Sequence, residues 1–208
     1  ITGSGNAAAR VGVSISDLSA GLFAAIGILA ALREREQTGV GATLDLAMLD
    51  CSVALMENAL SRLSVTGDMP RPLGTQHPAI APFQAFETAD GTLVVAAATD
   101  VMWRNLCDLL GDAELACDAR FSDNESRTLH RAELVEVLSA QFARQPSQFW
   151  IQKLTQAGVP VAPVRDTAEV LNDPELVARG MLHSMNDGSG AFVTAGSPIR
   201  FQGRESRL

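Results

Sequence analysis

The chain has 208 residues, of which 47% are hydrophobic and 5% aromatic, and it contains no tyrosine. Length and composition exclude a disordered protein and predict one or two domains with a buried core. The formal net charge of −8 argues against nucleic acid or an anionic membrane as a partner, and it offers no surplus of cations for a phosphate-rich ligand.

The cysteines indicate a reducing compartment. Cys51, Cys107 and Cys117 are odd in number, widely spaced and set in apolar or helical context, so they match neither a disulfide framework nor a metal-binding pattern. We therefore expect buried free thiols and a cytoplasmic protein. The three histidines are equally scattered, and no metal site is expected.

The first predicted helix covers residues 17–37, with Ser16 as its N-cap and Gly39 as its left-handed C-cap. Its longest apolar run, residues 18–32, falls short of the ~18 residues that cross a bilayer. Apolar residues surround most of the helix, which predicts burial on most sides rather than a membrane span. Its glycines permit close approach by another element. No signal peptide is recognised, and residues 1–9 are expected to form a loop.

A short strand and a second helix follow. Residues 43–46 alternate as a strand does, and residues 48–65 have a helical composition that ends at the glycine and prolines of residues 67–72. Asp17, Asp45 and Asp50 lie in these elements. Helix capping or exposure to solvent explains these carboxylates better than catalysis does.

A polar loop leads into a predicted hairpin in the middle of the chain. Residues 73–82 contain a glycine, a histidine and two prolines, and two strand-like runs, residues 83–88 and 93–98, flank Asp90-Gly91. Asp-Gly between two such runs is a strong hairpin signal. Because binding residues concentrate on loops held by rigid elements, this loop is a candidate binding segment.

The second half of the chain predicts helices and extended segments. Helices are expected over residues 100–110, 128–143, 147–156 and 167–171 and from Asp173, and extended segments over residues 157–164, 181–185 and 192–194. Thr99 or Asp100 is expected to cap the first of these helices, and Ser147 the third.

Charged residues precede the helix predicted from residue 128. Arg127 and Arg131 are four residues apart and are expected to lie on a solvated face or to pair with Asp123 or Glu125. His130, between them, is expected at the surface. None of these residues is predicted to act in catalysis.

Four segments resemble the family III CoA-transferases, the group of formyl-CoA transferase and carnitine CoA-transferase. They are residues 74–78 (GTQHP), 82–86 (PFQAF), 88–91 (TADG) and 157–164 (AGVPVAPV). Weaker matches follow the family's order through nearly the whole chain. Thr75 stands where asparagine is usual, which changes the loop's polar contacts, and Phe83 stands where tyrosine is usual, which removes a hydroxyl.

This resemblance implies an α/β fold: the small α+β domain and linker helices of a protein that forms an interlocked homodimer. It implies that the N-terminal Rossmann-like part is missing, roughly 180 residues by ordinary domain sizes. The implied parts are residues 1–63, the end of the large domain with long linker helices; residues 64–165, the small domain; and residues 166–208, a second linker that returns to the large domain.

The resemblance also implies a reaction. Similar enzymes move CoA from an acyl-CoA to a free carboxylic acid through an aspartyl intermediate, and the matching aspartate would precede Ile1, so no catalytic residue is assigned here. CoA and its thioesters would be substrates, with no permanently bound cofactor. The implied substrate-binding residues are Gly74, Thr75, Gln76 and His77, in a loop that shields acyl intermediates from water. If this loop acts as a lid, Gly74→Pro should lower the turnover of the enzyme with little loss of stability.

Two alternatives remain from the sequence. An α-methylacyl-CoA racemase has a similar fold and usually a glutamate near the position of Asp100, whereas the His77-Pro78 stretch favours a transferase. A non-catalytic dimerisation or binding module is the other alternative. Succinyl, formyl, carnitinyl and aromatic acids all remain open as substrates.

Overall fold

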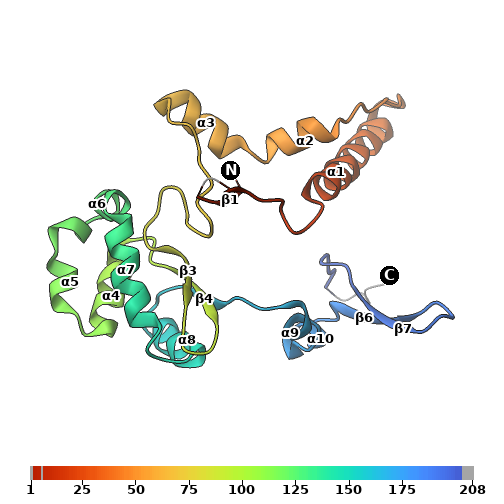
Figure 1. Ribbon diagram of the computed structural model, residues 1–208. Coiled ribbons are helices and arrows are strands. Elements are labelled where there is room, and N and C mark those ends of the chain that lie inside the picture. The colour runs from red at the N-terminus through yellow and green to blue at the C-terminus, as the bar shows by residue number, and fades with distance from the viewer. Residues whose placement is uncertain (1, 6, 203–208) are drawn as a thin grey trace. The chain divides into compact units, whose positions relative to one another are not determined.

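The computed structural model describes residues 2–5 and 7–202 and forms two compact units, Ile1–Pro78 and Ala79–Leu208 (Figure 1). Ile1, Asn6 and residues 203–208 lie outside the described residues. Helices occur together with small antiparallel sheets, which confirms the expected mixed α and β class. The three-part division at residues 63/64 and 165/166 stays a prediction.

Two short strands open the first unit. β1 (Gly3–Ser4) pairs antiparallel with β2 (Ala7–Ala8), and an isolated bridge joins Ser4 to Leu73. The sequence predicts only a loop here, because strands of two residues leave no alternating pattern to detect.

α1 (Ile15–Thr38) begins two residues before its predicted start. Ser14, not Ser16, occupies the N-cap position, and no side chain caps this end. Gly39 ends the helix with φ of 72°, which confirms the left-handed cap. With 24 residues, α1 meets the length and hydropathy criteria for a membrane span, which core helices of soluble proteins also meet.

The predicted burial of α1 is wrong within its unit. Only Ser19 is buried among its residues, and Leu22, Ile26 and Leu29 are 67%, 63% and 66% exposed. A helix that is apolar on most sides needs neighbours on most sides. In this unit α1 packs mainly against a single helix, α2 (Met48–Ala54), so much of its apolar surface stays uncovered.

α2 and α3 (Glu57–Thr66) divide the segment that the sequence predicts as one helix. The Ser52 hydroxyl of α2 donates to the Ser16 hydroxyl of α1 at 3.0 Å. Leu44 packs on α1 beside Gly27, where an added Cβ would lie 3.5 Å from Leu44 Cδ1, an ordinary van der Waals contact. Residues 43–46 form no strand, because the described residues provide no partner strand beside them.

The second unit contains a three-stranded antiparallel sheet in the order β3–β4–β5 (Figure 1). β3 (Phe83–Glu87) and β4 (Thr92–Ala96) form the hairpin predicted around Asp90-Gly91. β5 (Val161–Pro163) pairs with the other edge of β4, which confirms the extended backbone predicted from its prolines. Alternate residues of β3 and β4, such as Phe86 and Val95, are buried on one face.

Helical segments complete the compact part of this unit. They are α4 (Asp100–Leu110), α5 (Ala113–Cys117), the 3₁₀ helix η1 (Ala119–Phe121), α6 (Asn124–Leu129), α7 (Arg131–Phe142) and α8 (Ser147–Gln156). The sequence did not predict α5 and η1. It also predicted a single helix where α6 and α7 meet at His130. Leu129 ends α6 and is 79% exposed.

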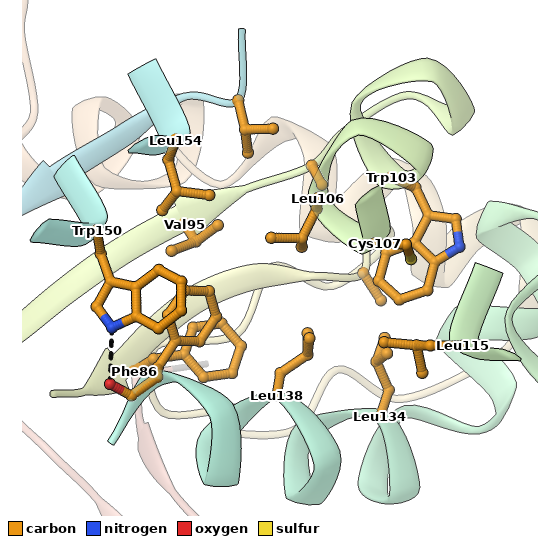
Figure 2. Packing of buried hydrophobic residues seen from close by; sticks show 14 of the residues in the cluster. Phe86, Val95, Trp103, Leu106, Cys107, Leu115, Leu134, Leu138, Trp150 and Leu154 are labelled. Atoms are coloured by element: carbon orange, nitrogen blue, oxygen red, sulfur yellow. Dashed lines mark hydrogen bonds between the residues drawn. The ribbon is translucent and has the colours of Figure 1, made fainter. Parts of the chain in front are cut away.

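A hydrophobic core joins the sheet to these helices (Figure 2). The ring centroid of Phe142 lies 4.9 Å from that of Phe86 and 5.0 Å from that of Trp150. The Trp150 indole N–H donates to the Phe142 carbonyl at 2.8 Å, so this large side chain is buried without an unsatisfied donor. Leu138 has no exposed surface, whereas Phe149 is 38% exposed.

The hairpin turn is fastened to α8. Asp90 Oδ1 accepts a hydrogen bond from the Ser147 backbone N–H at 2.7 Å, and the Thr88 and Ser147 hydroxyls lie 2.7 Å apart. Asp90 therefore caps α8 in place of the predicted Ser147, because Ser147 is already the first helical residue. The Ser147 N–H lowers the pKa of the Asp90 carboxyl by stabilising its charged form.

The last elements occur as predicted. They are α9 (Thr167–Leu171), α10 (Pro174–Ala178) and a hairpin of β6 (Leu182–Asn186) and β7 (Ala191–Ala195). Asp166 and Glu169 form a capping box on α9. Asp173 accepts the N–H groups of Glu175 and Leu176 at the start of α10 and pairs with Arg165.

Candidate functional site

The candidate loop begins with a left-handed glycine. Gly74 has φ of 62°, and its N–H donates to the Gly3 carbonyl at 2.7 Å. The Gln76 N–H donates to the Leu73 carbonyl at 3.1 Å, which closes a turn. Proline has neither positive φ nor an N–H group, so Gly74→Pro would break the turn itself. The substitution that the sequence suggested is therefore not a clean test of a lid.

A cavity of about 480 Å³ lies beside this loop, within the first unit. Its apolar wall includes Leu55, Met56, Met69 and Leu73, and its polar lining consists of Asn58, Arg62, Asp68, Arg71 and Gln76. Clefts of about 300–1,000 Å³ with apolar walls and a few polar groups are typical of small-molecule sites. The loop thus borders a space of suitable size for a substrate.

The four predicted binding residues relate to this cavity differently. Gly74 and Gln76 line it, whereas Thr75 and His77 are absent from its described lining. Thr75 is exposed and His77 is half-buried. The structure therefore brings two of the four residues to one cavity, together with α3 residues that sequence reasoning missed. A helical Asn58 and Arg62, four residues apart, are the sequence signal that could have found this face.

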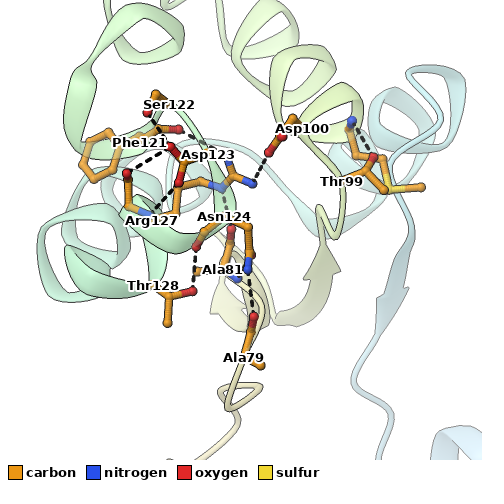
Figure 3. Close-up of polar contacts among 12 residues, drawn as sticks. Ala79, Ala81, Thr99, Asp100, Phe121, Ser122, Asp123, Asn124, Arg127 and Thr128 are labelled. Carbon is orange, nitrogen blue, oxygen red and sulfur yellow. Dashed lines mark hydrogen bonds and ion pairs between the residues drawn. The ribbon is translucent and has the colours of Figure 1, made fainter.

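The backbone just after the loop is held by Asn124 (Figure 3). Its side-chain amide donates to the Ala79 carbonyl at 2.8 Å, and its side-chain oxygen accepts the Ala81 N–H at 3.1 Å. An asparagine side chain satisfies both a donor and an acceptor in this way. Asn124 itself stands at the start of α6, which Asp123 caps through the Ser126 N–H at 2.8 Å.

Arg127, one turn further along α6, also holds this backbone, and we call Asn124 and Arg127 together the clamp. Its side chain is fully buried and donates to the carbonyls of Ala81 at 2.7 Å and Phe121 at 3.1 Å and to Asp100 Oδ1 at 2.9 Å (Figure 3). The guanidinium carbon lies 5.2 Å from the Trp103 ring centroid. The predicted solvated face is therefore wrong for Arg127: three acceptors and an aromatic ring replace water around its charge.

Asp100 contributes to the same clamp. Thr99 caps α4 by accepting the Met102 N–H at 3.2 Å, which leaves Asp100 as the first helical residue with its carboxylate directed to Arg127. Sequence reasoning paired Arg127 with Asp123 or Glu125 nearby in the chain. The observed partner lies 27 residues away, because the fold brings the start of α4 beside α6.

The remaining titratable residues form no second constellation. No cluster of three or more histidine, cysteine or acidic side chains that could hold a metal ion occurs among residues 2–5 and 7–202. His130 is half-buried rather than at the surface, with Nδ1 3.0 Å from the Ser126 carbonyl. Asp17, Asp45 and Asp50 are all exposed in the first unit.

The cysteines differ from the expectation at one position. Cys51 and Cys107 are buried free thiols, as predicted, but Cys117 is exposed at the end of α5. Burial raises the pKa of Cys107 to about 12, with Asp112 and Asp108 adding to the effect. A thiol with such a pKa stays protonated and unreactive at neutral pH.

Comparison with known proteins decides the family. Residues 1–208 match the description "CoA-transferase family III". The chain belongs to this family. It is 38% identical over 192 residues to acetyl-CoA:oxalate CoA-transferase of Acetobacter aceti, a match that covers 92% of this chain and 48% of that relative. It is 32% identical over 193 residues to succinyl-CoA:glutarate CoA-transferase of Mus musculus, covering 92% and 44%.

Solved structures agree with this family assignment. A CAIB/BAIF family protein from Brucella suis is 33% identical with a TM-score of 0.79, and the match covers 100% of this chain and 54% of that one. A Mycobacterium tuberculosis protein is 26% identical with a TM-score of 0.81, covering 95% and 52%. The chain thus spans about half the length of the family III relatives it matches. The resemblance inferred from residues 74–91 and 157–164 is confirmed.

Proposed function

We propose that the protein carrying this chain moves CoA from an acyl-CoA to a free carboxylic acid. Family membership over residues 1–208 is the observation that supports this proposal most strongly. The Acetobacter aceti and Mus musculus relatives are CoA-transferases by name, with oxalate or glutarate as one partner acid. CoA thioesters would be substrates and not permanently bound cofactors.

The proposed mechanism needs an aspartate that is not assigned within Ile1–Leu208. Its carboxylate attacks the thioester carbonyl, the C–S bond breaks, and CoA leaves as a thiolate from an acyl-aspartyl anhydride. The thiolate attacks the aspartyl carbonyl and releases the first acid, which leaves an aspartyl-CoA thioester. The acceptor carboxylate attacks the carbonyl of this thioester, the C–S bond breaks, and departure of the CoA thiolate leaves a second anhydride. The thiolate then takes the acceptor acyl group and regenerates the aspartate.

The chain's own contribution would be to hold substrate and exclude water. Each anhydride is lost if water reaches it, so a loop over the reacting groups protects the transfer. Gly74, Thr75, Gln76 and His77 are the proposed substrate-binding residues. The cavity that Gly74 and Gln76 line, and the clamp on Ala79 and Ala81, support this role.

A trapping experiment tests the proposal. The full-length protein is incubated with an acyl-CoA and an acceptor acid, with hydroxylamine added to convert an aspartyl thioester to a hydroxamate. We expect CoA exchange and one modified aspartate outside Ile1–Leu208, located by peptide mass spectrometry. Modification of Asp17, Asp45 or Asp50 would contradict the proposed location of the nucleophile, and no exchange with any acid would favour a non-catalytic module.

The racemase alternative loses its motivating residue. A racemase base must approach the α-proton of its substrate, whereas the Asp100 carboxylate accepts the Arg127 guanidinium at 2.9 Å. We also propose the interlocked homodimer of similar enzymes, and the exposed apolar side chains of α1 support a partner surface there.

A further inference from the structure

Two arginines face the cavity beside the candidate loop without a charged partner in the structure. Arg62 lies on α3 and Arg71 lies in the segment that leads to the loop, and both line the cavity. Within the described residues neither one has a carboxylate oxygen within 4.0 Å. Other described arginines, such as Arg104 and Arg144, also lack such a partner, so the position of two arginines on one cavity is the observation that points to an anion.

The charge of the lining suits a small anion. Asp68 is the acidic residue of the lining, so Arg62 and Arg71 leave it with one excess positive charge. Asn58 and Gln76 add neutral amide donors. A single carboxylate matches this excess. The 3′-phosphate of CoA, a monoester with about −1.5 to −2 charge, would exceed this excess of one positive charge.

The apolar wall of the cavity suits a ligand that has a hydrocarbon part as well as a carboxylate. Leu55, Met56 and Met69 can cover a short hydrocarbon chain, while the arginines bind the carboxylate at its end. We propose that Arg62 and Arg71 bind the non-reacting carboxylate of a dicarboxylic acid substrate in this cavity. This inference rests on the proposed CoA transfer, in which the other carboxylate reacts.

A second cavity, of about 550 Å³, is a weaker candidate. It lies in the second unit, where Arg144 and Lys153 line it together with Phe149 and Trp150. It includes none of the residues that resemble the family's binding loop. Its basic residues therefore have no second observation that points to a ligand.

Kinetics of the full-length protein test the inference. Arg62→Gln and Arg71→Gln keep a polar side chain of similar length but remove the charge. With acetyl-CoA as donor, we expect each variant to raise the KM for glutarate about 10-fold, the usual effect of losing one charge-assisted hydrogen bond. The KM for pentanoate, which lacks the second carboxylate, should change less than about twofold.

Arg33→Gln is the matched control in the same unit. Arg33 is exposed on α1, pairs with Glu36 at 3.2 Å and is absent from the described lining of the cavity. The KM values for glutarate, pentanoate and acetyl-CoA should therefore stay as in the wild type. An equal rise for glutarate and pentanoate would overturn the inference, because the arginines would then act on the reacting carboxylate or on folding. A rise in the KM for acetyl-CoA alone would assign them to CoA phosphate.

Binding without turnover separates this inference from the proposed function. Isothermal titration of glutarate into the wild type and both variants needs no transfer reaction. Binding that depends on both arginines, in a protein without CoA exchange, would support the site and contradict the function. If the protein exchanges CoA but both variants bind glutarate as the wild type does, the result would support the proposed function and contradict the arginine site.

Discussion

The two units bury their apolar side chains to very different extents. In the second unit, Phe86, Trp103, Leu138 and their neighbours form one closed core between sheet and helices. In the first unit, Cys51 and Ser19 are the buried residues among those described, while α1 exposes leucines and isoleucines along its length. One unit thus contains its own source of hydrophobic stabilisation, and the other presents apolar surface that a partner would have to cover.

A pair of leucine substitutions tests this comparison with the largest expected effect. Leu138 on α7 has no exposed surface and Leu29 on α1 is 66% exposed. Leu138→Ala should lower the free energy of unfolding by about 2–5 kcal/mol through lost burial and a cavity. Leu29→Ala should change it by less than about 0.5 kcal/mol for a single chain, whereas the proposed homodimer, if it covers α1, would raise this loss. Urea denaturation followed by circular dichroism gives both values, and equal losses would mean that α1 is covered in solution.

Arg127→Met tests whether a buried cation stabilises the second unit. The substitution keeps an unbranched chain but removes donors to two buried carbonyls and to Asp100. We expect a loss of about 2–4 kcal/mol in the free energy of unfolding. Arg120→Met, on an arginine whose exposed side chain pairs with Asp118, is the control and should leave the unfolding midpoint unchanged. Similar midpoints for both variants would refute the clamp.

Asn124→Ala should have a smaller effect in the same place. It removes the bonds to the Ala79 carbonyl and the Ala81 N–H, which are partly exposed, so about 1–2 kcal/mol is expected. If the clamp also positions the loop, the variant should lower kcat more than the midpoint shift explains. Asn172→Ala, on an exposed asparagine that donates to the Ala168 carbonyl, controls for loss of an amide. Unchanged amide exchange at residues 79–81 would contradict the clamp.

The smallest expected effect comes from ionisation of the buried Cys107 thiol at high pH. Burial raises the pKa of Cys107 to about 12 from a usual 9.0, so the folded protein retains a proton that the unfolded chain releases. The thiol's contribution to stability is present below pH 9 and is lost as the pH rises toward 12. Between these values wild type should lose stability faster than Cys107→Ala. Iodoacetamide should label the exposed Cys117 in the native state, and rapid native labelling of Cys107 would contradict its burial.

The structural features that were predicted correctly from the sequence depend on residues close together in the chain. The Asp90-Gly91 hairpin, the Thr99 cap of α4, the Gly39 end of α1 and the prolines of β5 each depend on residues a few positions apart. These features appear at or near their predicted positions. The resemblance of residues 74–91 predicted the family for the same reason, since its motifs are short and contiguous.

The predictions that were wrong concern contacts between residues far apart in the sequence. Arg127 is buried by Ala81 and Asp100, which are 46 and 27 residues away, and no i to i+4 pattern could reveal them. The strand predicted over residues 43–46 lacks a partner, and α1 lacks covering neighbours. For the site, sequence reasoning named Gly74 and Gln76 but missed Arg62 and Arg71, because the turn that joins them around a cavity is a property of the folded backbone.

The bond between Asp90 and the start of α8 has a consequence for local unfolding. The first N–H of α8 finds its acceptor in a turn 57 residues earlier, so helix end and hairpin turn satisfy one another. Opening either one exposes an unpaired group in the other. We therefore expect the amides of the turn and of the first turn of α8 to exchange with solvent at one common rate, as a single cooperative unit that is discontinuous in the sequence.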